Sequence, residues 1–110
     1  MPILEAMACG LPVIATDWSG QTEFFHSGVG YPLRVRRLVA AHAKCPYYLG
    51  WRWADPDEEH LIALMRYVYE HPDEARQVGA RAAQEAAACW TWAHAAERIH
   101  ARLLAVAAPV

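Results

Sequence analysis

The sequence predicts an α/β fold with a short parallel sheet and several helices. A short helical pattern leads through a Gly-Leu-Pro turn into the β-branched run "PVIAT" (Pro12 to Thr16), and together they make half of a βαβ unit. The second half of the chain holds three segments with helical spacing of apolar residues and recognisable helix starts. With 110 residues, 55% hydrophobic and 20% charged, the chain is long enough for one domain with a modest core.

The first half contains helices and strands in alternation. Pro2 to Cys9 is predicted to be a short helix, because proline suits a first turn and Gly10 suits the position after a helix end. Pro12 to Thr16 is predicted to be a buried strand. We expect a further short helix over Gly20 to His26 and a second strand over Tyr31 to Val35. The strand that a βαβ unit would place before Pro2 is missing from the sequence.

The middle of the chain, Arg36 to Trp53, shows no regular pattern and is predicted to be irregular. It begins in a basic run, Arg34, Arg36 and Arg37, which is typical of a solvated loop. It ends in "CPYYLGWRW", which is rich in aromatic residues. Such a stretch can bind a ligand, but we favour a role in covering the core or in packing on a neighbouring domain.

Three helices are predicted in the second half. Asp55 is expected to cap the first of them, with Pro56 at its first position and Glu58 completing a capping box. The second is expected to begin at Pro72 and the third after an N-cap at Thr91. The apolar faces expected for the three helices are Leu61, Leu64, Met65 and Val68; Ala75, Val78, Ala82 and Ala86; and Trp92, Ala96, Ile99, Leu103 and Val106.

Composition and spacing argue against several kinds of site. A net charge of −2 gives no electrostatic basis for binding nucleic acid. The histidines match no metal-ligand spacing, so no metal is expected, and no serine lies in a G-x-S-x-G elbow. The three cysteines, Cys9, Cys45 and Cys89, are far apart, which favours reduced intracellular thiols. No apolar run approaches the ~18 residues of a membrane span, and no signal peptide is visible.

Glu5 is the most informative charged residue. It lies in the first turns of a helix that should follow a parallel strand, at the edge where open α/β sheets bind their ligands. An ionised carboxylate only accepts hydrogen bonds, so its partners there would be hydroxyl donors such as a ribose diol. The alternative is a glutamate that faces water and is stabilised by the helix dipole.

The stretch "PILEAMACGLPVIATDWSGQTEF" strongly resembles the C-terminal domain of the group 1 glycosyltransferases, which are retaining enzymes that use nucleotide sugars. "WADPDEEHLIALMRYVYEHPDEARQVGARA" and the late Trp-Thr-Trp are also similar to this family. The resemblance implies the GT-B architecture, in which two Rossmann-like domains face each other across a cleft. Its signature is Glu, seven residues, Glu, followed by Ala-Met-Ala-x-Gly-x-Pro-Val-Ile-Ala-Thr, and Glu5 falls on the second Glu.

The resemblance also implies roles for individual residues. Glu5 would bind the ribose hydroxyls of the donor nucleotide, and the backbone around Met1 and Pro2 would approach its diphosphate. The loop that follows the first strand would line the cleft, although a turn at the end of a strand explains it equally well; its residues are Thr16, Asp17, Ser19 and Gly20. No residue of this chain is assigned a catalytic role. Donors of this family include GDP-mannose and UDP-sugars, and no metal cofactor is expected.

Residues 1–110 are therefore expected to be the C-terminal part of a nucleotide-sugar-binding domain, truncated on its N-terminal side. The first Glu of the signature would lie four residues ahead of Met1, and the acceptor-binding domain is also missing. The fragment alone is expected to be inactive. The full enzyme is expected to be cytoplasmic, with no transmembrane segment and with room for peripheral contact with a membrane. Two alternatives are a non-catalytic subdomain that binds another protein and an unrelated nucleotide-binding module.

Overall fold

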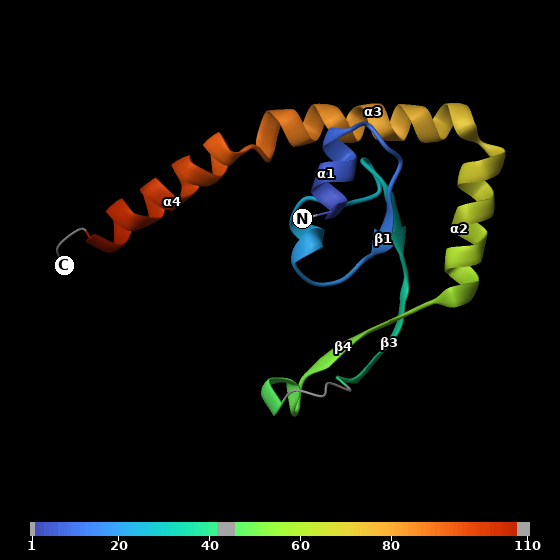
Figure 1. Ribbon diagram of the computed structural model, residues 1–110, viewed down its shortest axis with the longest axis horizontal. Coiled ribbons are helices and arrows are strands. Elements are labelled where there is room, and N and C mark those ends of the chain that lie inside the picture. The colour runs from blue at the N-terminus through green and yellow to red at the C-terminus, as the bar shows by residue number, and fades with distance from the viewer. Residues whose placement is uncertain (1, 42–45, 108–110) are drawn as a thin grey trace.

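The computed structural model describes residues 2–41 and 46–107, and it confirms the predicted α/β fold (Figure 1). Helices and strands alternate in the first half, and three helices follow one another in the second. In chain order the elements are α1 (Pro2–Ala8), β1 (Ile14–Thr16), the 3₁₀ helix η1 (Ser19–Glu23), β2 (Tyr31–Leu33), β3 (Val35–Ala40), the 3₁₀ helix η2 (Pro46–Tyr48), β4 (Arg52–Pro56), α2 (Glu58–Glu70), α3 (Pro72–Cys89) and α4 (Trp92–Ala107).

A parallel pair of strands lies beside the core. β1 pairs with β2 so that Ile14 is opposite Tyr31 and Thr16 is opposite Leu33. The connection between them runs through η1, which is a shorter and tighter helix than the one expected over Gly20 to His26. Phe25 and Val29, which follow η1, are buried together with Met7 of α1 and with Ala82 and Ala86 of α3. Both predicted strands are present, with slightly shorter bounds. The first was predicted to be buried, but β1 is only half-buried.

Helix α3 packs closely on the turn between α1 and β1. Gly10 ends α1 with a φ of 73°, in the left-handed region that favours glycine. Gly79 of α3 lies against this turn, because a Cβ atom built on Gly79 would overlap the carbonyl group of Gly10. The predicted face of α3 is confirmed, since Ala75, Val78, Ala82 and Ala86 are all buried. The small residues of α3 thus allow α1 to approach it.

The prediction of an irregular segment over Arg36 to Trp53 was wrong for most of the described residues. β3 and β4 form an antiparallel hairpin, in which Leu38 is opposite Ala54 and Val39 is opposite Trp53. A bulge between Val35 and Arg37 shifts the alternation, and this conceals the strand in the sequence. The basic run accordingly lies on and beside β3 and not in a loop. Residues 42–45, which include part of the aromatic-rich stretch, lie outside the described residues.

The start of α2 also differs from the prediction. Asp55 and Pro56 belong to β4, and the N-cap is Asp57, whose side chain accepts a hydrogen bond from the backbone N–H of His60. The sequence offers two aspartates around one proline, and pairing with β3 keeps the first of them in the strand. On the face expected for α2, Leu61, Leu64 and Val68 are half-buried. Met65 of that face is 59% exposed.

Helix α4 extends away from the rest of the molecule (Figure 1). Thr91 precedes it, and its hydroxyl oxygen accepts a hydrogen bond from the N–H of His94 at 3.4 Å, as expected of an N-cap. The apolar face of α4 is exposed: Trp92 by 91%, Ile99 by 61% and Leu103 by 62%. No described helix is both long enough and apolar enough to cross a membrane.

We expect this exposed face of α4 to drive self-association of the isolated chain, because association removes contiguous apolar surface from water. Replacing Ile99 and Leu103 together by serine should shift the chain towards monomer in sedimentation velocity runs over a concentration series. Ala101→Ser, which changes the same exposed helix outside the apolar face, should leave the association unchanged. A wild-type chain that stays monomeric at all concentrations would contradict the expectation.

Candidate functional site

The loop after β1 lies at the carboxyl end of the parallel pair. The N–H of Asp17 donates to the carbonyl oxygen of Leu33 at 2.9 Å, which ties the loop to the end of β2. The carbonyl oxygen of Thr16 accepts hydrogen bonds from the N–H of Trp18 at 2.8 Å and from the side-chain amide of Gln21 at 2.8 Å. Ser19 has a φ of 65°, a conformation that a residue other than glycine seldom adopts. The loop is thus a tightly bonded turn that presents Asp17, Ser19 and Gly20 to solvent.

A hollow of about 520 Å³ lies between the start of α1 and η1. Its lining residues are Pro2, Ile3, Gly20, Gln21, Glu23, Phe24 and Trp90. This volume is in the range of small-molecule sites, which measure roughly 300–1,000 Å³. Most of the wall is apolar, and Glu23 is its one ionisable residue among those described. The hollow can therefore take an uncharged or aromatic group more readily than a phosphate.

Two aromatic residues of this wall were not predicted as site residues. The rings of Phe24 and Trp90 meet edge to face, with their centroids 5.8 Å apart. The guanidinium carbon of Arg98 lies 4.8 Å from the centroid of the Trp90 ring. The indole N–H of Trp90 is buried without a hydrogen-bond acceptor among the described residues. Trp90 lines the hollow although it is 88 positions after Pro2 in the sequence. The only indication of its role in the sequence was the Trp-Thr-Trp motif that begins with it.

The predicted site residues are only partly brought together. Pro2 and Gly20, 18 positions apart in sequence, line the same hollow. Glu5 is exposed on α1, three positions after Pro2, and is not among the lining residues. Of the loop residues, Thr16 is half-buried and Asp17 and Ser19 are exposed beside the hollow without lining it. Met1 lies outside the described residues.

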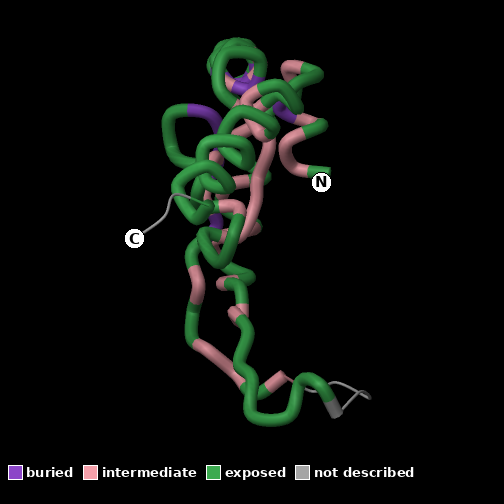
Figure 2. The backbone as a smooth tube through the Cα atoms, turned by 90° about the vertical axis from the view of Figure 1, so that its left-hand side faces the viewer, coloured by how far each residue is buried: buried purple, intermediate pink, exposed green. Residues whose placement is uncertain are grey.

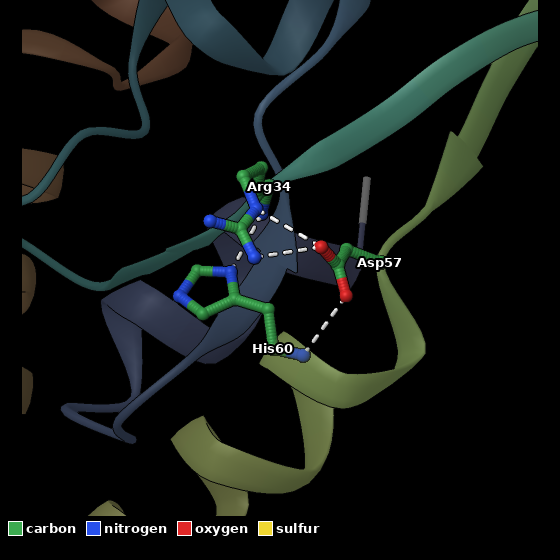
Figure 3. Close-up of polar contacts among 3 residues, drawn as sticks. All are labelled: Arg34, Asp57 and His60. Carbon is green, nitrogen blue, oxygen red and sulfur yellow. Dashed lines mark hydrogen bonds and ion pairs between the residues drawn. The ribbon is translucent and has the colours of Figure 1, made fainter.

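The strongest polar cluster lies elsewhere, where the hairpin meets α2 (Figure 3). The guanidinium of Arg34 donates to one carboxylate oxygen of Asp57 from Nε at 3.0 Å and from Nη2 at 2.7 Å. The other oxygen of Asp57 accepts from the N–H of His60 at 3.1 Å, and Nδ1 of His60 accepts from the N–H of Arg34 at 3.0 Å. These bonds join the base of the hairpin to the first turn of α2. They satisfy one another, which indicates a structural cluster.

The same bonds lower the pKa of Asp57. The hydrogen bond from the N–H of His60 contributes most, followed by the hydrogen bond from the side chain of Arg34. A carboxyl whose pKa is lower in the folded than in the unfolded chain stabilises the fold above its ordinary pKa of 3.8. We therefore expect that this contribution is lost as the pH falls below about 4, and that the melting temperature falls with it.

We expect Asp57→Ala to lower the melting temperature at neutral pH, because it removes the N-cap of α2 and leaves Arg34 without its carboxylate. Loss of a helix cap of this kind typically corresponds to about 4–8 °C in a domain of this size. Asp57→Asn should lower it less, because the amide oxygen can still cap the helix. Equal melting temperatures for the wild type and Asp57→Ala in thermal denaturation would contradict the structural role.

A second hollow, of about 480 Å³, lies between α3 and the loop before β2. Nδ1 of His26 accepts a hydrogen bond from the N–H of Gly28 at 3.1 Å. The other ring nitrogen, Nε2, therefore carries a proton and donates to the carboxylate of Glu85 at 3.2 Å. Arg81 donates to the carbonyl oxygen of Gly28 at 3.0 Å. These contacts fasten the loop to α3. Within residues 2–41 and 46–107, no three histidine, cysteine, aspartate or glutamate side chains are grouped so that they could hold a metal ion.

Comparison with known protein families matches residues 1–101 to a family described as glycosyl transferase-like. No curated protein and no solved structure matches the chain. The family match includes all of the elements that build the hollow, from Pro2 of α1 to Trp90 at the end of α3. Because it extends over nearly the whole length of 110 residues, the chain belongs to the glycosyl transferase-like family.

Proposed function

We propose that the chain binds the nucleotide-sugar donor of a retaining glycosyltransferase. The observation that carries this proposal is the family match, which covers Glu5 and all the residues that line the hollow between α1 and η1. In the reaction, the bond from the anomeric carbon to the diphosphate oxygen breaks, and the oxygen of an acceptor hydroxyl bonds to the same carbon with its configuration retained. The nucleoside diphosphate departs and takes up the proton of that hydroxyl. We propose a hexose as the transferred sugar and a GT-B arrangement for the complete enzyme.

Glu5 is proposed to hold the ribose. It stands exposed on a helix that is fixed by Met7 in the core and by the close contact of its final turn with α3. A carboxylate on a fixed helix can accept hydrogen bonds from both hydroxyls of a diol. The loop residues Thr16, Asp17, Ser19 and Gly20 are proposed to line the same cleft, and the backbone around Met1 and Pro2 to approach the diphosphate.

The residues that line the hollow are better suited to binding the donor than to transferring its sugar. Its apolar surface, with the rings of Phe24 and Trp90, suits a nucleobase or the apolar side of a sugar ring. Transfer also needs positive charge that stabilises the departing diphosphate. No arginine or lysine is among the described residues that line the hollow. We propose that other parts of the complete enzyme supply those cations, that a further domain binds the acceptor, and that no metal takes part.

The proposal predicts saturable binding without turnover. The 110-residue chain should bind either UDP or GDP when it is titrated with each of them in a calorimeter. Incubation with UDP-glucose or GDP-mannose should yield no transfer of sugar to any acceptor. Measurable transfer by the chain alone would contradict the proposed division between two domains. Failure to bind either nucleotide would contradict donor binding.

The exposed face of α4 favours a second candidate function, a subdomain that binds another protein without catalysis. Trp92, Ile99 and Leu103 present apolar surface of the kind found at protein interfaces. Self-association or partner binding through α4, together with no affinity for nucleotides, would favour this candidate.

The two described cysteines bear on location. Cys9 and Cys89 are exposed free thiols. Exposed thiols persist in a reducing compartment, and we therefore propose that the protein is cytoplasmic.

A further inference from the structure

The hairpin of β3 and β4 projects from the body of the molecule (Figure 1, Figure 2). Exposed aromatic residues and one exposed leucine lie at its end. Tyr47 is 85% exposed, Leu49 79% and Trp51 67%, and Tyr48 and Trp53 are exposed as well. We call these five residues the aromatic tip. The stretch was expected to cover the core or to pack on a neighbouring domain, and its exposure contradicts the first of these two expectations. The tip belongs to the part of the hairpin farthest from α3.

The aromatic tip is held by the hairpin's own hydrogen bonds. The N–H of Ala41 donates to the carbonyl oxygen of Trp51 at 2.9 Å, and the N–H of Trp51 donates to that of Tyr48 at 3.1 Å. The rings of Tyr48 and Trp53 lie against each other, with centroids 6.3 Å apart. Gly50, with a φ of 81°, makes the turn that separates Leu49 from Trp51. These hydrogen bonds fix the backbone of the tip, and the five side chains on it are exposed to solvent.

Positive charge is concentrated in the same segment. Residues 34–56 hold five of the chain's ten basic residues but one of its twelve acidic residues, Asp55. Arg37 is paired with Asp55 at 3.1 Å, and Arg34 with Asp57. Arg36 and Arg52 are exposed on the two strands, and Nη2 of Arg52 donates to the carbonyl oxygen of Leu38. The remainder of the chain is acidic, so the hairpin is a basic projection on an acidic body.

We propose that the aromatic tip inserts into the headgroup region of an anionic lipid bilayer, with Arg36 and Arg52 contacting lipid phosphates. Tryptophan and tyrosine favour the boundary between headgroups and acyl chains, because each combines an apolar ring with a polar group. A basic segment is drawn to an anionic surface and not to a neutral one. A single-stranded nucleic acid would use the rings for stacking but would leave Leu49 without an apolar environment. This inference is independent of the proposed donor binding.

The proposal can be tested with the full chain by sedimentation with lipid vesicles. Vesicles of phosphatidylcholine with phosphatidylglycerol should bind the chain, and vesicles of phosphatidylcholine alone should bind it at least tenfold more weakly. Binding should weaken as salt is raised, because the attraction between exposed charges is screened. Leu49→Ser with Trp51→Ser should reduce binding at least tenfold. Arg36→Gln with Arg52→Gln should reduce it about tenfold or more, at about fivefold for each charge.

Matched variants elsewhere in the chain distinguish binding through the aromatic tip from non-specific binding through other exposed apolar or charged residues. Tyr69→Ser removes an aromatic residue of α2 that is 86% exposed, and Arg66→Gln removes an exposed charge of the same helix. Ile99→Ser with Leu103→Ser removes the apolar face of α4. All of these should retain full vesicle binding. Circular dichroism melts should show that the two hairpin variants, Leu49→Ser with Trp51→Ser and Arg36→Gln with Arg52→Gln, are folded, because the replaced side chains are exposed.

Three results would overturn the proposal. The first is no binding to anionic vesicles. The second is vesicle binding that persists in folded tip variants or is lost in the α4 variant instead. The third is binding to a single-stranded oligonucleotide with none to anionic vesicles, which would identify the hairpin as a nucleic-acid surface.

Discussion

Glu5→Ala is expected to weaken nucleotide binding by roughly 2–4 kcal/mol, or about 30- to 1,000-fold. The substitution removes the carboxylate proposed to accept two ribose hydroxyls, and alanine keeps the helix intact. Hydrogen bonds to a charged group contribute about 1.5–3 kcal/mol each, but water competes at the exposed surface of α1 and reduces the sum. Calorimetric titration with the nucleoside diphosphate that the wild type prefers measures the loss.

The melting temperature separates the two explanations of Glu5. Loss of a contact with the helix dipole corresponds to only about 0.3–1 kcal/mol, so Glu5→Ala should unfold close to the wild type. Glu59→Ala is a matched control, because Glu59 is an exposed acidic residue in the first turn of α2. It should change neither affinity nor melting temperature appreciably. Unchanged affinity with a lowered melting temperature in Glu5→Ala would make Glu5 a structural residue.

Gly79→Ala is expected to destabilise the fold by about 2 kcal/mol, although alanine is the better helix former. A Cβ atom at this position would overlap the carbonyl oxygen of Gly10 and lie 2.9 Å from its carbonyl carbon. Both atoms are backbone, so relief requires α3 to move away from the turn that ends α1. That movement loosens the packing of Met7 against Ala82 and Ala86 and offsets the gain of about 1 kcal/mol in helix propensity.

Urea unfolding of Gly79→Ala and Ala80→Gly tests this contact by its sign. Ala80 is exposed on the same helix, so its replacement by glycine should cost only about 1 kcal/mol through propensity. Gly79→Ala should cost more, even though propensity alone predicts a gain. It should also weaken nucleotide binding, because it loosens the packing that fixes α1, the helix that carries Glu5. A midpoint at or above that of the wild type would show that α1 and α3 are less closely packed than the structure indicates.

Local patterns predicted the helices and the parallel strands well. The small-residue face of α3 is buried as its spacing indicates, and Gly10 ends α1 in the conformation expected of it. The hairpin was missed because a bulge and two adjacent arginines, Arg36 and Arg37, break the alternation of β3. The N-cap of α2 was misplaced by two residues, because the choice between Asp55 and Asp57 depends on strand pairing.

The site was less predictable than the fold, since a hollow is made by residues that are distant in sequence. The helix beginning at Pro2 and the loop containing Gly20 could be placed at one sheet edge from topology alone. Trp90 reaches the same hollow only because α3 crosses α1 and ends beside Phe24, and no local pattern encodes that crossing. The roles of Glu5 and of the loop residues remain predictions.

The most direct test of donor binding is a cycle that changes Glu5 and the ribose together. Wild type and Glu5→Ala are each titrated with a nucleoside diphosphate and with its 2′,3′-dideoxy analogue, which lacks the diol. If Glu5 binds the diol, the wild type should prefer the complete ribose by roughly 30-fold or more, and Glu5→Ala should bind the two ligands almost equally. Equal discrimination by both proteins would contradict the account, because the diol would then be recognised without Glu5.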